Sequence, residues 1–434
     1  MKLAGMLGRT GANRPIATNL WARITALGAL MVSSLLVARI GGPALVGVFV
    51  LLRMVPWLAG VLTTGGLYGA APYFLAAEKR NGVRYGPTIF WMAVTGGLVG
   101  SLAWLGVTPL LQNVLFPQLG AGLVAWAGVS VFTQVMETSG KASSQGSDDL
   151  TGSNRVIVLE EIVFLPYFVV LHSLGVDAAL AIVASLPLGD LTTAVPTWVR
   201  LRRRGFFRGA GGPSLGQARE VVRYGLRAQV GSIILLLNAR LDFALVGGMV
   251  GARALGIYAV ASRFAELLRL PSLAVNYVLY PAYARRGGAT AAGEARAMMP
   301  RVGWIPLAAA VPLGVAATFF IPWLYGEPFR AAITPTYVLL LGLSGSAVSG
   351  VITAFLYGDG RPGLNSLAMG AGLVITIALD LLLIPPFGVL GAALASSVAY
   401  LSTTGFLVVS FAVLARGRAS AGADDDREMT ELKR

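Results

Sequence analysis

Long apolar stretches recur along nearly the whole chain, and they constrain its fold more than any other feature. Twelve of them reach or approach the length of about 20 residues that a helix needs to cross a bilayer. Only 12% of the 434 residues are charged and the mean hydropathy is +0.72, which a soluble core of this size cannot hide. We therefore predict an all-α polytopic membrane protein. The expected spans are 17–40, 44–76, 87–110, 119–140, 155–173, 178–199, 222–249, 254–283, 302–324, 331–357, 364–385 and 389–415.

The chain also contains an internal repeat. Residues 41–49 (GGPALVGVF) align with residues 250–258 (VGARALGIY) at an offset of 209 residues, and both segments lie between long apolar runs. Duplicated blocks of membrane helices are typical of transporters. We therefore expect a cytosolic N-terminus (1–16), an N-terminal six-helix bundle (17–200), a basic cytosolic linker (201–221), a C-terminal six-helix bundle (222–416) and a disordered cytosolic tail (417–434).

The positive charges indicate which side of the membrane each link faces. Lys and Arg are usually retained in the cytoplasm, and most of the 34 here fall at the N-terminus, in alternate links and in the tail. The opposite links, such as LLQNVLFPQLG and IPPFG, are short and nearly free of positive charge. We therefore expect both ends to be cytoplasmic, and we read the net charge of +14 as a topology signal, so that no nucleic acid is expected as a partner.

The sequence lacks the motifs of the common catalytic and metal sites. It has no GxxxxGK[ST] phosphate-binding loop, and with one histidine, His172, and no cysteine it offers neither zinc-ligand spacing nor thiolates. A membrane glycan polymerase or glycosyltransferase would need acidic or histidine residues on a long outer loop, and the outer links here are short. We therefore expect a protein that is not an enzyme and that holds no cofactor or metal.

Three segments carry a resemblance to a known family: ARIGGPALVGVF, ARLDFALVGGMVGARALGIYAVASRFAE and LYGDGRPGLNSLAMGAGLVITIALDLLLIPPFGVLGAALASSVAYL. Over roughly residues 17–415 the chain resembles the polysaccharide-transporter branch of the multidrug/oligosaccharidyl-lipid/polysaccharide (MOP) flippase superfamily. The resemblance implies a V-shaped, MATE-like fold of two pseudo-two-fold-related six-helix bundles around a central cavity. It also implies a monomer that translocates lipid-linked oligosaccharide by alternating access, in contact with membrane lipids and with the glycan polymerase machinery.

Three arginines within the predicted spans are candidates for binding the substrate. A charge at mid-bilayer costs at least about 3 kcal/mol on insertion scales, so such residues tend to line cavities or find partners. Arg23, Arg53 and Arg263 lie on the first, second and eighth spans. Guanidinium groups bind phosphate oxygens through paired hydrogen bonds, as a lipid pyrophosphate requires. These spans resemble the cavity-lining helices of the lipid II flippase branch. For Arg23 and Arg53, the alternative is a side chain that extends to the cytoplasmic interface.

Four further charged residues are candidates for ion coupling or for structural ion pairs. Arg240 and Asp242 lie two residues apart, and Glu266 follows Arg263 by three, a spacing that suits pairing along a helix. Asp380 has no cationic neighbour on its own helix. It is a candidate for coupling to H⁺ or Na⁺, and a hydrogen-bonded polar core residue is the alternative.

Together these features predict a flippase for a polyprenyl-pyrophosphate-linked oligosaccharide in a bacterial inner membrane, serving surface polysaccharide or lipopolysaccharide (O-antigen) synthesis. A cation-coupled multidrug antiporter of the same fold is the first alternative. Such an antiporter would favour acidic cavity residues because its substrates are cationic, whereas the candidate residues here include several arginines. A membrane glycan polymerase or glycosyltransferase is the second alternative.

Overall fold

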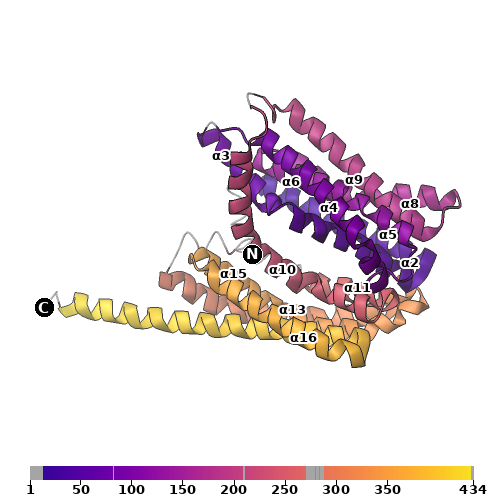
Figure 1. Cartoon of the computed structure of the whole chain (residues 1–434). Coiled ribbons are helices and arrows are strands. Elements are labelled where there is room, and N and C mark those ends of the chain that lie inside the picture. Colours follow the sequence, from indigo (N-terminus) through magenta and orange to yellow (C-terminus); the bar gives the residue numbers. More distant parts are fainter. Residues whose placement is uncertain are drawn as a thin grey trace. The chain divides into compact units, whose positions relative to one another are not determined.

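In the computed structural model, which describes residues 13–81, 83–208, 211–269, 279, 283 and 288–431, every regular element is a helix (Figure 1). The all-α prediction is therefore confirmed. The elements are α2 (Asn13–Thr63), α3 (Leu67–Asn81), α4 (Gly86–Val114), α5 (Ala121–Ala127), α6 (Val129–Gly146), α7 (Leu150–Ile162), α8 (Phe164–Ser173), α9 (Ala178–Arg203), α10 (Leu215–Met249), α11 (Ala252–Glu266), η1 (Leu267–Arg269), α13 (Gly288–Tyr325), η2 (Glu327–Ala332), α14 (Ile333–Leu343), α15 (Ser346–Gly358) and α16 (Pro362–Glu431).

Two of these helices each join parts of two predicted spans. α16 contains 364–385 and 389–415, whereas α2 contains 17–40 and the first part of 44–76, which continues in α3. The backbone of α2 breaks at Gly42 (φ 63°) and that of α16 breaks at Gly388 (φ 55°), a left-handed conformation that glycine adopts without a Cβ clash. Seven helical stretches of the described chain are long and apolar enough to cross a membrane, and two of them, Trp21–Thr63 and Gly363–Ala415, contain these breaks. Each break therefore ends one expected span and begins the next.

The chain forms two compact units. Unit 1 comprises Met1–Gly41 and Val48–Val230, and unit 2 comprises Gly42–Gly47 and Gly231–Arg434. The boundary near residue 230 lies inside α10, beyond the predicted linker 201–221. Phe206, at the beginning of that linker, is buried in the core of unit 1 against Trp198. Apolar residues among the basic ones thus attach the linker to unit 1.

In unit 1, α6 packs against α3, α4, α7 and α9, and Figure 1 shows α4, α6 and α9 side by side. Glycines on α4 allow the close packing. A Cβ on Gly97 would lie 2.9 Å from the Phe132 ring, and one on Gly100 would lie 2.7 Å from a Val131 methyl group. Small residues at contact faces let helices approach closely in lipid, where no hydrophobic force between helices assists packing.

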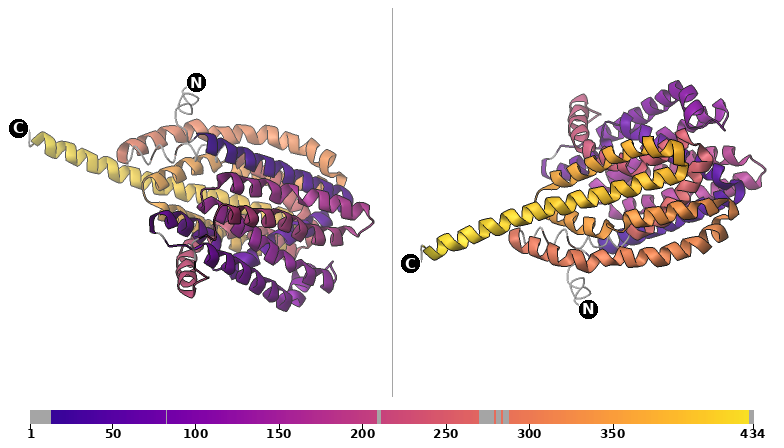
Figure 2. Two further views of the ribbon diagram at one scale, coloured as in Figure 1. Left: turned by 90° about the horizontal axis from the view of Figure 1, so that it is seen from above. Right: turned by 90° about the horizontal axis from the view of Figure 1, so that it is seen from below.

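In unit 2, α16 packs against α14 and α15, and α13 also packs against both of those helices. Close contact between α14 and α16 depends on Gly342, where a Cβ would lie 2.5 Å from the Cα of Ser397. The far end of α16, yellow in Figure 2, extends beyond the other helices of this unit. Residues 417–431, which the sequence analysis expects to be disordered, are thus part of a helix. The segment ADDDREMTE contains Ala, Arg, Glu and Met, all good helix formers.

The internal repeat forms a close helix crossing inside unit 2. A Cβ on Gly47 would clash with the carbonyl oxygen of Ala252, and a Cβ on Gly256 would clash with that of Pro43. Pro43 and Ala252, like Gly47 and Gly256, are equivalent under the 209-residue offset. The contact of Gly47 with Ala252 is therefore equivalent, under the repeat, to the contact of Gly256 with Pro43. Such reciprocal contacts are what a local two-fold relation between two repeated segments produces.

Candidate functional site

Arg53 lies on α2 in unit 1 and is paired with a carboxylate. Its Nη1 atom is 2.6 Å from Oε2 of Glu161 on α7, and the two side chains are 23% and 13% exposed. Its guanidinium also lies 5.6 Å from the centre of the Phe49 ring. Arg53 is therefore a half-buried cation held by one acidic partner and by the face of an aromatic ring.

Further charged groups surround this pair and form what we call the unit 1 polar cluster. Nζ of Lys141 on α6 lies 2.6 Å from Oε2 of Glu160 on α7. The hydroxyl of Thr133 donates to Oδ2 of Asp190 on α9 at 2.6 Å, and the carboxyl groups of Asp190 and Glu137 are hydrogen-bonded to each other. The cluster comprises Arg53, Thr133, Glu137, Lys141, Glu160, Glu161 and Asp190.

The acidic members of this cluster are not among the site residues predicted from the sequence. Glu137 and Lys141 are four residues apart on one helix face, and Glu160 and Glu161 are adjacent, so the local signal was present. The meeting of α2, α6, α7 and α9 was not visible, because residues 108 positions apart form the ion pair between Arg53 and Glu161.

Arg23 lies near the beginning of α2, where its side chain is exposed. Its Nε donates to Oδ1 of Asn19 at 3.0 Å, and Nδ2 of Asn19 donates to Oδ1 of Asn154 on α7 at 2.7 Å. Arg23 and Arg53 therefore both belong to unit 1 and both connect to α7. Arg263 lies in the last turn of α11 in unit 2, where it is half-buried.

In unit 2, Asp242 is buried in a hydrogen-bonded site. It accepts hydrogen bonds from the Tyr258 hydroxyl at 2.5 Å, from the Ser396 hydroxyl at 3.3 Å and from the backbone N–H of Phe243 at 2.8 Å. Arg240, which the sequence placed opposite Asp242, lies 3.6 Å from Glu266. Asp242 is therefore held by hydroxyl and amide donors, and Arg240 is paired with a different carboxylate.

Asp380 lies on α16 and is fully buried, at 0% exposure. Neither of its carboxylate oxygens has a hydrogen-bond partner within the described part of the chain, and the negative charge of Asp242 acts on it. A buried carboxylate without a partner is strongly disfavoured unless it takes up a proton or a cation. We refer to Asp242, Tyr258, Asp380 and Ser396 as the unit 2 acidic site.

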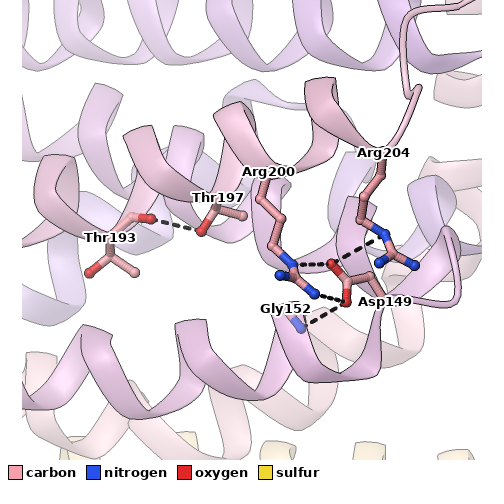
Figure 3. A network of polar contacts seen from close by, with 6 residues as sticks. All are labelled: Asp149, Gly152, Thr193, Thr197, Arg200 and Arg204. Carbon is pink, nitrogen blue, oxygen red and sulfur yellow. Dashed lines mark hydrogen bonds and ion pairs between the residues drawn. The ribbon is translucent and has the colours of Figure 1, made fainter.

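A third polar group joins the beginning of α7 to the end of α9 in unit 1 (Figure 3). Asp149 caps α7 by accepting from the backbone N–H of Gly152 at 3.1 Å, and Arg200 of α9 donates to both of its carboxylate oxygens, at 2.6 and 2.9 Å. Arg204 approaches to 3.7 Å. The hydrogen bonds from Arg200, with those of the capped helix end and the charge of Arg204, lower the pKa of Asp149. This clamp ties the turn before α7 to the end of α9.

Comparison with known proteins identifies the family. The sequence model of a family described as "Polysaccharide biosynthesis protein" matches residues 36–334, well over half of the chain. The chain belongs to this polysaccharide biosynthesis family. The match includes Arg53, Arg263, Asp242 and the whole of the unit 1 polar cluster, whereas Asp380 lies beyond it.

Relatives of this family member are named flippases and transporters. It is 22% identical over 373 residues to a probable low-salt glycan biosynthesis flippase, Agl15, of Haloferax volcanii, covering 85% of this chain and 76% of that protein. Its fold matches the lipid II flippase MurJ in an inward closed conformation with a TM-score of 0.75 and 12% identity, over 93% and 90% of the two chains. It matches the Vibrio cholerae MATE transporter VcmN with a TM-score of 0.63 and 12% identity, over 93% and 97%.

The family match agrees with the predicted polysaccharide-transporter family, and the structural matches confirm the predicted multi-pass, MATE-like fold. They also support the prediction that this protein is not an enzyme, because the relatives carry the names of flippases and transporters.

Proposed function

We propose that the protein is a flippase that moves a polyprenyl-pyrophosphate-linked oligosaccharide from the cytoplasmic to the outer leaflet of a bacterial inner membrane by alternating access. The product would serve surface polysaccharide or lipopolysaccharide (O-antigen) synthesis. Family membership supports the substrate class. The observation that carries the proposal is the half-buried Arg53, whose charge inside an apolar helix is compensated by an ion pair with the carboxylate of Glu161.

A pyrophosphate is suited to replace Glu161 at Arg53. Both ligands offer paired oxygens to the planar guanidinium, but the pyrophosphate brings two or more negative charges where the carboxylate brings one. The exchange leaves Arg53 paired throughout, so no buried cation is exposed to lipid during loading. Arg23 and Arg263 remain further candidate residues for binding the substrate's phosphates.

The unit 2 acidic site is the proposed coupling site. Asp380 has two buried oxygens without partners, and Asp242 lies close enough for its charge to act on it. A proton or Na⁺ between these carboxylates would compensate charge that the surrounding residues leave unbalanced. Binding and release of this ion would drive the change between inward and outward states.

Transport by purified protein in liposomes tests the proposal. The wild type is expected to translocate a fluorescent lipid-linked oligosaccharide and to leave a cationic dye untransported. Arg53→Ala should abolish oligosaccharide translocation, and Arg53→Lys should retain little of it, because an ammonium group cannot form the paired hydrogen bonds. Glu327→Gln, which alters an exposed ion pair in unit 2, is the matched control that should transport normally.

Two results would overturn the proposal. Translocation by Arg53→Ala at the wild-type rate, with protein correctly inserted, would remove the guanidinium from the mechanism. Transport of the dye in place of the oligosaccharide would assign the fold to a multidrug antiporter, the function that buried acidic residues in both units would suit.

A further inference from the structure

Two carboxyl groups lie in direct contact inside unit 1. Glu137 on α6 and Asp190 on α9 are 5% and 9% exposed, and they are hydrogen-bonded to each other. A carboxylate has only acceptor atoms, so a hydrogen bond between two carboxyl groups requires a proton on one of them. The two carboxyl groups can form this bond only while they share a proton.

Further unsatisfied polar atoms lie on the same helices. Oε1 of Glu137 has no hydrogen-bond partner in the described residues, although the side chain is buried. The hydroxyls of Ser139, Ser143 and Ser185, on α6 and α9, are fully buried and also without partners there. Buried polar atoms in native proteins are nearly always satisfied, so exceptions point to a ligand or a functional role. The free carboxylate oxygen is thus available to a second proton.

Charged groups from the neighbouring helices set the proton affinity of the pair. The positive charge of Arg53 favours the ionised form of Asp190, whereas the negative charge of Glu160 disfavours it. Lys141 favours the ionised form of Glu137. Of the other helices packed against α6, α4 and α5 contain no ionisable side chain, and α3 contributes Tyr68, Tyr73 and Glu78 among those described. On the helices packed against α9, α8 carries Tyr167 and His172, and α7 carries Glu160 and Glu161. The charged groups that act on the pair are Arg53, Lys141 and Glu160.

We propose that Glu137 and Asp190 form a proton-binding site whose occupancy is linked to the binding of a pyrophosphate headgroup at Arg53. This linkage rests on the proposed function, because it requires an anion at Arg53. When the pyrophosphate replaces Glu161 at Arg53, it brings more negative charge than the carboxylate it displaces, and the ionised form of Asp190 becomes less favourable. The pair then takes one proton from water, an O–H bond forms on the carboxylate, and the charge of the pair changes from −1 to 0.

Linkage between two sites is reciprocal. If anion binding draws a proton to the pair, then a proton on the pair strengthens anion binding by the same factor. Headgroup affinity is therefore expected to rise as the pH falls, by up to about tenfold per pH unit for one linked proton. Release would be favoured wherever the pair loses its proton, which gives the substrate's exit a direction set by pH.

The test uses the full-length protein in lipid nanodiscs, with farnesyl pyrophosphate as the probe. Infrared difference spectroscopy detects the carbonyl stretch of a protonated carboxyl group, which ionised carboxylates lack. In the wild type, an acid band should be present before the probe is added and should grow when the probe binds. Glu137→Gln and Asp190→Asn should each lose the pair's band, whereas the control Glu327→Gln should keep it.

Binding measured at several pH values provides the second readout. The probe itself titrates, so its own pH dependence is taken from Glu137→Gln and subtracted. The wild type should retain an additional pH dependence that Asp190→Asn also lacks. Because Gln and Asn preserve shape and hydrogen bonding, these variants should remain folded, and monodispersity in the nanodisc checks this.

Each remaining outcome overturns the inference in a distinguishable way. Absence of any acid band that depends on Glu137 or Asp190 would show that the pair shares no proton. A band that does not change with the probe, together with Arg53-dependent binding of equal pH dependence in wild type and Glu137→Gln, would remove the linkage and leave the flippase proposal intact. Failure of the wild type to bind the probe at all would overturn both.

Discussion

The crossing between the two repeated segments makes the sharpest prediction about stability. Alanine at Gly47 would place its Cβ 2.6 Å from the carbonyl carbon of Ala252, and alanine at Gly256 would place its Cβ 2.8 Å from that of Pro43, where ordinary contacts are 3.4–4 Å. The obstructing atoms are backbone, so relief requires the two helices to separate by about 1 Å. Overpacking of this kind typically costs about 1–3 kcal/mol. We expect at least that for each substitution.

The assay is thermal unfolding in detergent, followed by the fluorescence of the eight native tryptophans. Each single variant should unfold several degrees below the wild type. The double variant should cost less than the sum of the two, because helices already separated by the first Cβ accommodate the second.

Gly106→Ala is the matched control for this prediction. A Cβ at this position of α4 meets nothing within 4 Å, so alanine should stabilise the helix, by about 0.5–1 kcal/mol. If Gly47→Ala and Gly256→Ala unfolded at the wild-type temperature, or if Gly106→Ala were as damaging as either, the close crossing would be refuted.

Three further predictions concern single polar groups. Asp149→Asn should lower the melting temperature; because the pKa of Asp149 is lowered in the fold, the wild-type advantage should be constant above its ordinary value of 3.8 and should disappear as the pH falls through the lowered pKa, which melting curves across acid pH would show. Asp380→Asn should abolish the dependence of transport on a proton or Na⁺ gradient while raising thermal stability, since it removes a buried carboxylate without partners; transport that still follows the gradient would contradict this. Tyr258→Phe should destabilise unit 2 by about 1.5–3 kcal/mol, because Asp242 loses its shortest hydrogen bond, and an unchanged melting curve would argue against that bond.

Much of the fold could be predicted from the sequence, because hydropathy and local geometry determine it. The apolar runs predict the helices, and the expected span boundaries at 40/44 and 385/389 enclose Gly42 and Gly388, where the backbone turns. The repeat predicted that residues 41–49 and 250–258 are equivalent, although not that they pack against each other. The 209-residue offset indicates a duplication of the sequence. Whether the two segments touch depends on how their helices cross, which the offset does not contain.

The side-chain partners could not be predicted in the same way. The sequence suggested that Arg240 pairs with Asp242 across a bend. In the structure, Arg240 lies beside Glu266, and Asp242 accepts a hydrogen bond from Tyr258. Arg53 has no acidic neighbour within a helical turn, and its partner comes from α7. Partners of this kind follow from helix packing at long range, which the spacing of residues along a single sequence does not encode.

The central claim is that Arg53 exchanges Glu161 for the substrate's pyrophosphate. The most direct measurement is transport of a lipid-linked oligosaccharide by the reversed pair, Arg53→Glu with Glu161→Arg, in liposomes. This double variant preserves the ion pair but moves the guanidinium from α2 to α7. We predict a melting temperature close to that of the wild type and no translocation above that of empty liposomes. Translocation at the wild-type rate would show that the position of this guanidinium does not matter, and would contradict the account.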